Sequence, residues 1–332
     1  MNRIQYLDSL RLFAILGVIH VHSTYKFDLS SCYQDWLCSC VRDCAPRWII
    51  PDFVMLSGVF MLNPKKVITL KENFTLRIPR FLIAYVSWWL IYCLYKVGIG
   101  VVTNNLKISI DILLPEVHLW FLPLIIGLYL MLPFFRIINQ DSKLTRYYLI
   151  VWLAFTSVEF FLPFVGFSIE TIRPLYGIYL FSGYMFLGYQ LFHIELSKKQ
   201  KVLIYVGGVV GCVVSIIGTF ALSDFPGPNH PLFTQNIGPC LVMMSMAVFL
   251  FFKDFFEEER SWMVKLNEYV RKDLFGIYLV HILWLDIFSR IIFRLELSWI
   301  ISSIPLSVLS FVFSLYSVKI IRLIPYLRNI VK

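Results

Sequence analysis

The first apolar segment of the chain carries three groups that can do chemistry: a carboxylate, a guanidinium and an imidazole. Asp8 and Arg11 lie three residues apart, close enough on a helix to pair and largely cancel the cost of burying their charges. The step from Arg11 to His22 covers three helical turns plus about 20°, so both side chains face one side, about 16 Å apart. An imidazole titrates near neutral pH and can accept a proton. The spacing indicates a polar channel along one helix face; the alternative is a structural ion pair with an interfacial histidine.

Two arginines stand three residues apart at the start of another apolar run. Arg77 and Arg80, in the sequence Arg-Ile-Pro-Arg, could grip a phosphate group with their paired N–H donors. The alternative is that both anchor a helix at the inner membrane face, because basic residues flank most inner helix ends.

Polar groups also occur in three further apolar runs. One contains Asp52 and Ser57, a later one begins at His118, and a third contains His281. We expect His22 and His118 to lie at the same outer depth, and His281 to lie deeper. Taken singly, each of these residues is more often a packing or interfacial residue than a catalyst.

The elements that must position these side chains are membrane helices. The 332 residues are 58% hydrophobic and 15% charged, with a mean hydropathy of +0.73. Soluble domains are nearly half apolar and about a quarter charged, so a soluble enzyme, a disordered chain and a secreted disulfide scaffold are excluded. Unbroken apolar runs also argue against an outer-membrane barrel, and they predict an all-α polytopic protein of about ten membrane helices. The expected spans are 6–23, 47–62 with an alternative start near 36, 81–101, 117–137, 147–165, 175–192, 202–222, 237–252, 274–292 and 298–317.

The basic residues predict the orientation of this single membrane domain, residues 1–332. On the N-terminal side of the membrane fall 21 lysines and arginines, and eight fall on the other side. Since the excess marks cytoplasmic loops, both termini are expected to be cytoplasmic, with Arg11 nearer the cytoplasm than His22. The net charge of +9 is therefore explained by topology and not by nucleic-acid binding. The inner loop 253–273 mixes apolar and charged residues and is predicted to hold an interfacial helix.

Four cysteines crowd the expected outer loop 24–46, namely Cys32, Cys38, Cys40 and Cys44. An oxidising outer face would permit disulfides, whose pairing the sequence does not decide. There is no C-x-x-C motif, and residues two apart on a helix, such as His20 and His22, point away from each other. No metal site is predicted.

Taken together, these segments resemble the acyltransferase 3 family of membrane acyltransferases. The Arg-x10-His spacing of the first helix and the Arg-x-x-Arg of the third match two motifs of that family. Three further segments resemble its Ser-Gly, His-Leu-Trp-Phe and Tyr-Leu-x-His motifs: residues 53–58, 118–133 and 275–281. Asp52 departs from the pattern, since an apolar residue is expected there.

The resemblance implies a ten-helix enzyme of the bacterial inner membrane that moves an acyl group, usually acetyl, from cytoplasmic acyl-CoA to a sugar hydroxyl of a surface or lipid-linked glycan. Many relatives carry an extra hydrolase-like domain; this chain ends about fifteen residues past the last predicted helix, so we expect it to act alone. The expected partners are acyl-CoA, the glycan acceptor and membrane lipids, with no nucleic acid and no bound cofactor. A homo-oligomer is compatible with the sequence.

Our mechanistic hypothesis assigns the catalytic chemistry to three residues, His22, Arg11 and His118. His22 would take the hydroxyl proton or carry the acyl group, and Arg11 would bind the pantetheine or the developing negative charge. Arg77 and Arg80 would bind the acyl-CoA phosphates. Supporting roles are expected for Asp8, Asp52, Ser57, Tyr278 and His281.

Two other functional classes stay open at this stage. A transporter or flippase of glycan intermediates would also combine ten helices with intramembrane charges, although the sequence shows no inverted-repeat halves. A non-catalytic subunit of a polysaccharide-assembly complex would use the same polar residues for folding alone. The sequence does not decide the sugar, the hydroxyl position, or acetyl against succinyl.

Overall fold

The computed structural model describes residues 4–29, 32–102, 110–167, 173–235, 238–256 and 261–331. Every regular element in these ranges is helical, which confirms the all-α class. Parts of two predicted loops, residues 30–31 and 257–260, and the first residue of the span predicted at 237–252 lie outside the described residues.

The ten expected spans all correspond to helices, with ends shifted by a few residues. The α-helices are α1 (Gln5–Thr24), α2 (Tyr33–Cys44), α3 (Ile49–Met61), α4 (Leu70–Glu72), α5 (Ile78–Val102), α6 (Phe121–Gln140), α7 (Ser142–Phe161), α8 (Arg173–His193), α9 (Lys198–Leu222), α10 (Pro239–Phe255), α11 (Ser261–Val270), α12 (Leu274–Ile292) and α13 (Trp299–Leu323). Three short turns of helix matter below: the π-turn Asn73–Arg77 and the 3-10 turns Val117–Trp120 and Arg328–Ile330.

Seven helical segments of the described chain are long and apolar enough to cross a membrane. Three predicted spans, which form α1, α8 and α10, are not among them. Helix α10 has only 17 residues, and α1 carries Asp8, Arg11 and two histidines. The chain is thus a multi-pass membrane protein in which α1 is the most polar of the expected spans.

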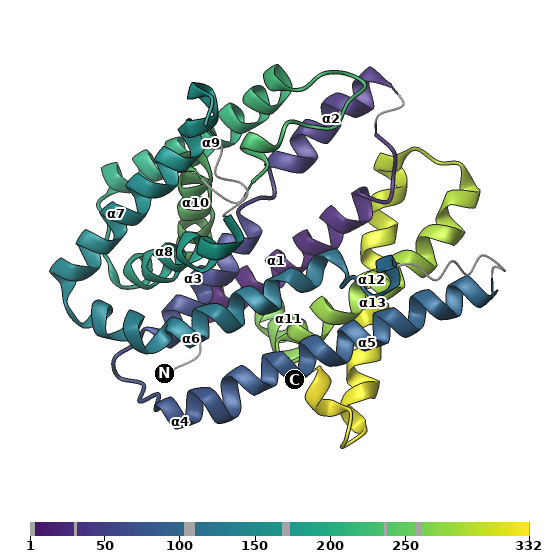
Figure 1. The fold of residues 1–332 in the computed structure, drawn as a ribbon, viewed down its shortest axis with the longest axis horizontal. Helices are drawn as coiled ribbons and strands as arrows, with labels where there is room; N and C mark the ends of the chain where they lie inside the picture. Colours follow the sequence, from purple (N-terminus) through teal and green to yellow (C-terminus); the bar gives the residue numbers. More distant parts are fainter. Residues whose placement is uncertain are drawn as a thin grey trace.

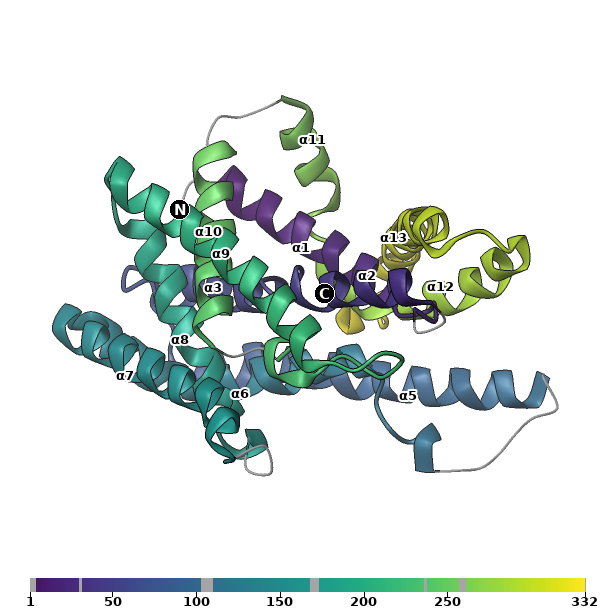
Figure 2. The same cartoon turned by 90° about the horizontal axis from the view of Figure 1, so that it is seen from above.

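Helix α1 runs through the middle of the molecule (Figure 1) and packs against α3, α10, α11, α12 and α13. Its first half, with Leu7 and Leu10, belongs to a core built mainly from α3, α6, α8 and α10. Its second half, with Ile15 and Ile19, belongs to a second core with α5, α12 and α13. Figure 2 shows α11 on one side of α1, and α5 and α6 on the other. Polar residues on α1 therefore lie at the junction of two apolar cores.

The predicted interfacial helix is present as α11. Asn267 of α11 donates a hydrogen bond to the Ser9 hydroxyl of α1, at 2.9 Å. Both residues are buried, so α11 is fixed to the first half of α1. Its position at the membrane surface stays a prediction.

The segment expected as the cysteine-containing outer loop 24–46 is largely helical, and a candidate membrane span begins at Tyr33, close to the alternative start near residue 36. Residues 33–44 form the helix α2, whose inner face packs on α9. Cys40 and Cys44, one turn apart on α2, are buried, and Cys44 lies 3.1 Å from the Thr219 hydroxyl. All seven cysteines are free thiols. The amphipathic spacing of α2, which the loop assignment overlooked, explains why these thiols pack instead of pairing.

Helices α3 and α8 approach so closely that glycine is required at the contact. A Cβ added to Gly58 would lie 1.9 Å from the carbonyl oxygen of Met185, and one added to Gly188 would lie 2.4 Å from that of Met55. Small residues at helix crossings allow such backbone contact in membranes. This crossing holds α3, and hence Ser57, in place.

Replacing Gly58 with alanine should destabilise the protein by about 1–3 kcal/mol, because the backbone of α8 must move. Thermal unfolding of the detergent-purified protein measures the effect. The matched control is Gly98→Ala in α5, where the described residues leave open space around the added methyl group. Equal unfolding temperatures for the two variants would contradict the close packing of α3 on α8.

Both termini are expected to face the cytoplasm, on the strength of the basic-residue count. Green fluorescent protein fused after the last residue should fluoresce, and alkaline phosphatase fused there should be inactive. Phosphatase fused after α1, at Asp28, should be active, because we expect that point to lie across the membrane from the termini. The reverse pattern would show that the orientation is inverted.

Candidate functional site

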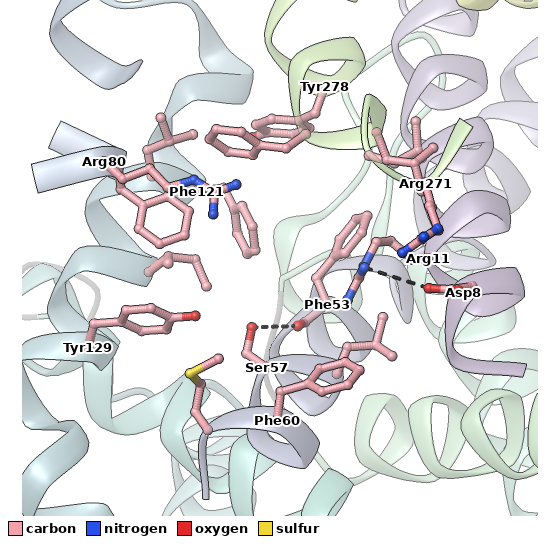
Figure 3. Close-up of a pocket in the computed structure, with 18 of the residues that line it drawn as sticks. Asp8, Arg11, Phe53, Ser57, Phe60, Arg80, Phe121, Tyr129, Arg271 and Tyr278 are labelled. Atoms are coloured by element: carbon pink, nitrogen blue, oxygen red, sulfur yellow. Dashed lines mark hydrogen bonds and ion pairs between the residues drawn. The ribbon is translucent and has the colours of Figure 1, made fainter. Parts of the chain in front are cut away.

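A cavity of about 740 Å³ lies between α1, α3, α5, α6 and the start of α12. Much of its wall is apolar and aromatic, including Phe53, Phe60 and Phe121. Five basic side chains from separate parts of the chain also line it: Arg11, Lys66, Arg80, Arg271 and Lys272. Figure 3 shows Arg80 on one side of the cavity, and Arg11 and Arg271 on the opposite side. An apolar hollow with basic walls suits an elongated ligand that has an apolar body and anionic groups.

One face of α1 forms a wall of this cavity. Asp8, Arg11 and Ile15 line it at the i, i+3, i+7 spacing of a single helix face. An Arg11 Nη1 atom lies 3.9 Å from Asp8 Oδ1, and the guanidinium carbon lies 5.7 Å from the centre of the Phe60 ring. His22 continues the same face, seven residues beyond Ile15. The structure thus places the Arg-x10-His pair along one polar stripe, as the spacing predicted.

Three histidines from distant parts of the chain meet beyond the cavity. The ring centres of His22 and His118 are 6.3 Å apart, those of His22 and His281 are 5.4 Å apart, and those of His118 and His281 are 5.0 Å apart. His281, expected to lie deeper, has its ring directly beside that of His118, and its depth relative to His22 and His118 stays a prediction. We refer to His22, His118 and His281 as the histidine cluster. No group of His, Cys, Asp and Glu within the described part of the chain has an arrangement that could hold a metal ion.

Several nitrogen atoms of the histidine cluster have no hydrogen-bond partner among the described residues. His281 Nδ1 lies 2.6 Å from the carbonyl oxygen of Tyr278, which can only accept, so Nδ1 carries the proton and donates it. His281 Nε2 and both ring nitrogens of His118 are buried without a hydrogen bond to any described residue. Because buried polar atoms are normally satisfied, these three are open positions for a ligand or water.

Tyr278 joins the cavity to the histidine cluster. It lines the cavity, and its ring centre lies 5.5 Å from that of His118 and 5.9 Å from that of His281. Its hydroxyl donates to the backbone oxygen of His118, which fixes the turn before α6 against α12. The cavity therefore ends close to the histidine cluster at Tyr278, and its basic side chains lie farther from that cluster than Tyr278 does.

The two arginines of the Arg-x-x-Arg motif lie on a second cavity of about 550 Å³. Arg80 lines both cavities, whereas Arg77 lines the second only. An Arg77 Nη2 atom is 2.6 Å from Glu72 Oε1, so part of its donor capacity is already used within the protein. The pair does share one cavity, but the two arginines are not equivalent.

Asp52 and Ser57 lie on different sides of α3. Ser57 lines the main cavity, and its hydroxyl donates to the Phe53 carbonyl oxygen at 3.1 Å. Asp52 is fully buried, lines neither cavity, and has no hydrogen-bond partner among the described residues for either carboxyl oxygen. The structure therefore places Asp52 outside the cavity wall.

Sequence reasoning missed three of the basic wall residues, Lys66, Arg271 and Lys272. It assigned them to membrane orientation, which any lysine or arginine at an inner helix end can serve. The turn between α11 and α12 carries Arg271 and Lys272 to the cavity. Their signal in the sequence is only their position directly before the ninth apolar run.

Comparison with protein-family models matches residues 4–319 to the acyltransferase domain of the acyltransferase 3 family. The matched segment includes the main cavity and the whole histidine cluster. Neither the curated proteins nor the solved structures contain a match to this chain.

Removing the carboxylate beside Arg11 should destabilise the protein more than removing both charges, because an uncompensated charge is costly in an apolar setting. We expect Asp8→Asn to lower the unfolding temperature, and Asp8→Asn combined with Arg11→Gln to recover part of the loss. The double-mutant cycle is measured by thermal unfolding in detergent. Strictly additive effects would show that the 3.9 Å contact contributes no pairing energy.

Proposed function

Because the chain belongs to the acyltransferase 3 family, we propose that it transfers an acyl group, acetyl in the simplest case, from acyl-CoA to a sugar hydroxyl of a surface or lipid-linked glycan. The family match makes it a membrane acyltransferase; the donor, the acceptor and the bacterial inner membrane as its location are our proposal. The main support is the cavity with basic walls. Tyr278, which lines this cavity, also lies against the rings of His118 and His281.

The main cavity is the proposed donor site. Acyl-CoA joins several phosphate groups to a long, largely apolar pantetheine arm that ends in the thioester. Arg80 would bind phosphate with charge-assisted hydrogen bonds, supported by Lys66, Arg271 and Lys272. The arm would lie along the aromatic wall, with the thioester beyond Tyr278.

Arg11 is best placed to hold the middle of the donor. It lines the cavity, and the helix separates it from His22 by about 16 Å. A group at that distance does not touch a carbonyl that is also in reach of His22. We therefore assign Arg11 to the pantetheine or phosphate part of acyl-CoA, and not to the reacting carbonyl.

In the proposed reaction the acceptor hydroxyl oxygen attacks the thioester carbonyl carbon while His22 takes the hydroxyl proton. The carbon–sulfur bond then breaks, the oxygen ester stays on the acceptor, and the CoA thiolate leaves and takes up the proton. The open nitrogens of His118 and His281 can accept a hydrogen bond from the acceptor and orient it toward His22. Holding both reactants in this way lowers the entropic part of the barrier.

His22→Ala should abolish acyl transfer while leaving acyl-CoA binding nearly unchanged, since His22 lies beyond the cavity wall. The assay follows label from acetyl-CoA into the glycan fraction of membranes, and isothermal titration measures donor binding. The matched control is His20→Ala, because His20 faces α13 and bonds to Ser307. Full activity of the His22 variant would remove this residue from the mechanism.

Arg80→Gln should weaken acyl-CoA binding about tenfold, which corresponds to about 1.4 kcal/mol, because a charge-assisted contact is lost. Arg77→Gln should have a smaller effect, since Arg77 lines only the second cavity. Titration of both purified variants with acetyl-CoA gives the comparison. A larger loss for the Arg77 variant would move the phosphate site to the second cavity.

A further inference from the structure

On both α1 and α12, the residues that follow the cavity-lining residues come in the same order: a histidine and then a charged residue. On α1 the cavity-lining residues are followed by His22 and then, one turn later, by Lys26 just beyond the helix end. On α12 they are followed by His281 and then by Asp286. Both helices therefore carry a charged residue about one turn beyond the histidine cluster, on the side away from the cavity.

Two further segments repeat this order. On α5, Tyr92 contacts the His118 ring at 5.3 Å between centres, and Tyr95 follows one turn farther from the cavity. Before α6, His118 is preceded by Glu116, again on the side away from the cavity. Four segments that differ in direction and sequence thus place polar groups at one level beyond the histidines.

These polar groups contact one another across the helices. Lys26 Nζ lies 3.0 Å from Asp286 Oδ1, and the Tyr95 hydroxyl donates to Asp286 Oδ2 at 2.6 Å. Arg290, one turn farther along α12, also donates to Asp286 Oδ2 at 2.9 Å, so Asp286 connects α1, α5 and α12. Nearby, Lys96 of α5 pairs with Glu116 at 3.0 Å. We refer to Lys26, Tyr95, Lys96, Glu116 and Asp286 as the polar layer.

The polar layer is partly open, whereas His118 and His281 beneath it are buried. The side chains of Lys26 and Asp286 are 29% and 25% exposed, but His118 is 2% exposed. Charges exposed to lipid at this depth would be costly, so these side chains meet water. Water at these side chains would be about one helical turn, roughly 6 Å, from imidazole nitrogens that have no partner among the described residues.

We propose that the polar layer is the entrance and the hydroxyl-binding subsite for the acceptor of the proposed acyl transfer. A polyhydroxylated, sugar-like acceptor enters from the side opposite the donor cavity, and Asp286 and Lys26 hydrogen-bond to its hydroxyls. One hydroxyl of the acceptor then reaches His22, which lies between the bound donor and the bound acceptor. This inference rests on the proposed function, but the route of entry can be tested without knowing the acceptor.

The subsite has the chemistry that sugar hydroxyls need. A carboxylate accepts hydrogen bonds, an ammonium donates them, and a phenol does both. A sugar hydroxyl both donates and accepts hydrogen bonds. The Lys–Asp–Tyr group can therefore exchange its internal contacts for contacts with acceptor hydroxyls at little cost. Binding of the acceptor here and of the donor in the main cavity keeps the two substrates from competing for one opening.

The route is tested with a cysteine placed at the base of the polar layer. In intact cells, the thiol of the His22→Cys variant is treated with membrane-impermeant methanethiosulfonates, one cationic and one anionic, and its modification is followed by peptide mass spectrometry. Adding Asp286→Lys should shift the ratio of the two rates toward the anionic reagent about tenfold, because a charge on the path selects against ions of its own sign. Asp286→Asn, the milder variant, should shift the ratio in the same direction by less.

The chain offers a matched control for this charge change. Asp254 accepts from Lys201 Nζ at 2.6 Å and from the Tyr205 hydroxyl at 3.0 Å, which makes a Lys–Asp–Tyr group between α9 and α10 like that of Asp286 apart from Arg290. Asp254→Lys and Asp254→Asn should leave the rate ratio at the introduced thiol unchanged. Equal ratios for the Asp286 and Asp254 variants, or no modification of the introduced thiol from outside the cell in any variant, would overturn the proposed entrance.

A second measurement separates this inference from the proposed function. With acetyl-CoA as the donor, Asp286→Asn should lower acetyl incorporation into membrane glycans about tenfold and leave acetyl-CoA binding unchanged. If the protein without substitutions incorporates no acetyl group, the donor or the acceptor in the proposed function is wrong, and the rate ratios at the introduced thiol still decide the entrance. If the Asp286 variant incorporates acetyl normally, the residue does not bind the acceptor.

Discussion

The cost of holding charge in an apolar surrounding governs this structure. Asp8 and Arg11 lie on a helix whose two halves belong to different hydrophobic cores, and neither core could accept them on its buried side. The two charges can be kept only if the helix turns them toward a shared hollow. The cavity lies at this junction of the two cores, and His22 follows on the same face of α1. The polar face of α1 is therefore turned toward the space that the neighbouring helices leave unfilled.

Two of the three clustered histidines lie inside α-helices, and the third lies in the 3-10 turn that precedes α6. His22 and His281 lie inside α1 and α12, and His118 is fixed at the start of α6 by the Tyr278 hydroxyl. Each side chain is thus held by the packing of a whole helix, which is the arrangement that keeps reacting groups within a fraction of an ångström. The main cavity and the polar layer lie at opposite ends of the same four segments. The proposed transfer between two unlike substrates on two sides of a membrane would need this separation.

The sequence predicted single-helix properties well, because they depend on local spacing. The span at residues 274–292 has the bounds of α12, and the shared face of Arg11 and His22 follows from 3.6 residues per turn. It failed where a polar segment also had an inner face. Residues 33–44 mix polar side chains such as Gln34 and Asp35 with apolar ones, and their amphipathic pattern was less apparent than their cysteines. Helix α2 forms because α9 is available to cover that face.

By itself the sequence determined that the chain is helical and membrane-embedded, and which side chains are too polar to face lipid, because hydropathy and helical periodicity are properties of neighbouring residues. Only the tertiary structure decided which of these side chains meet. His118 and His281 are separated by 163 positions, yet their rings lie 5.0 Å apart. Arg271 and Lys272 became cavity residues, and Asp52 did not, through the packing of α12 and α3. Contacts of this kind depend on how helices cross, and no local pattern encodes a crossing between segments so distant in the chain.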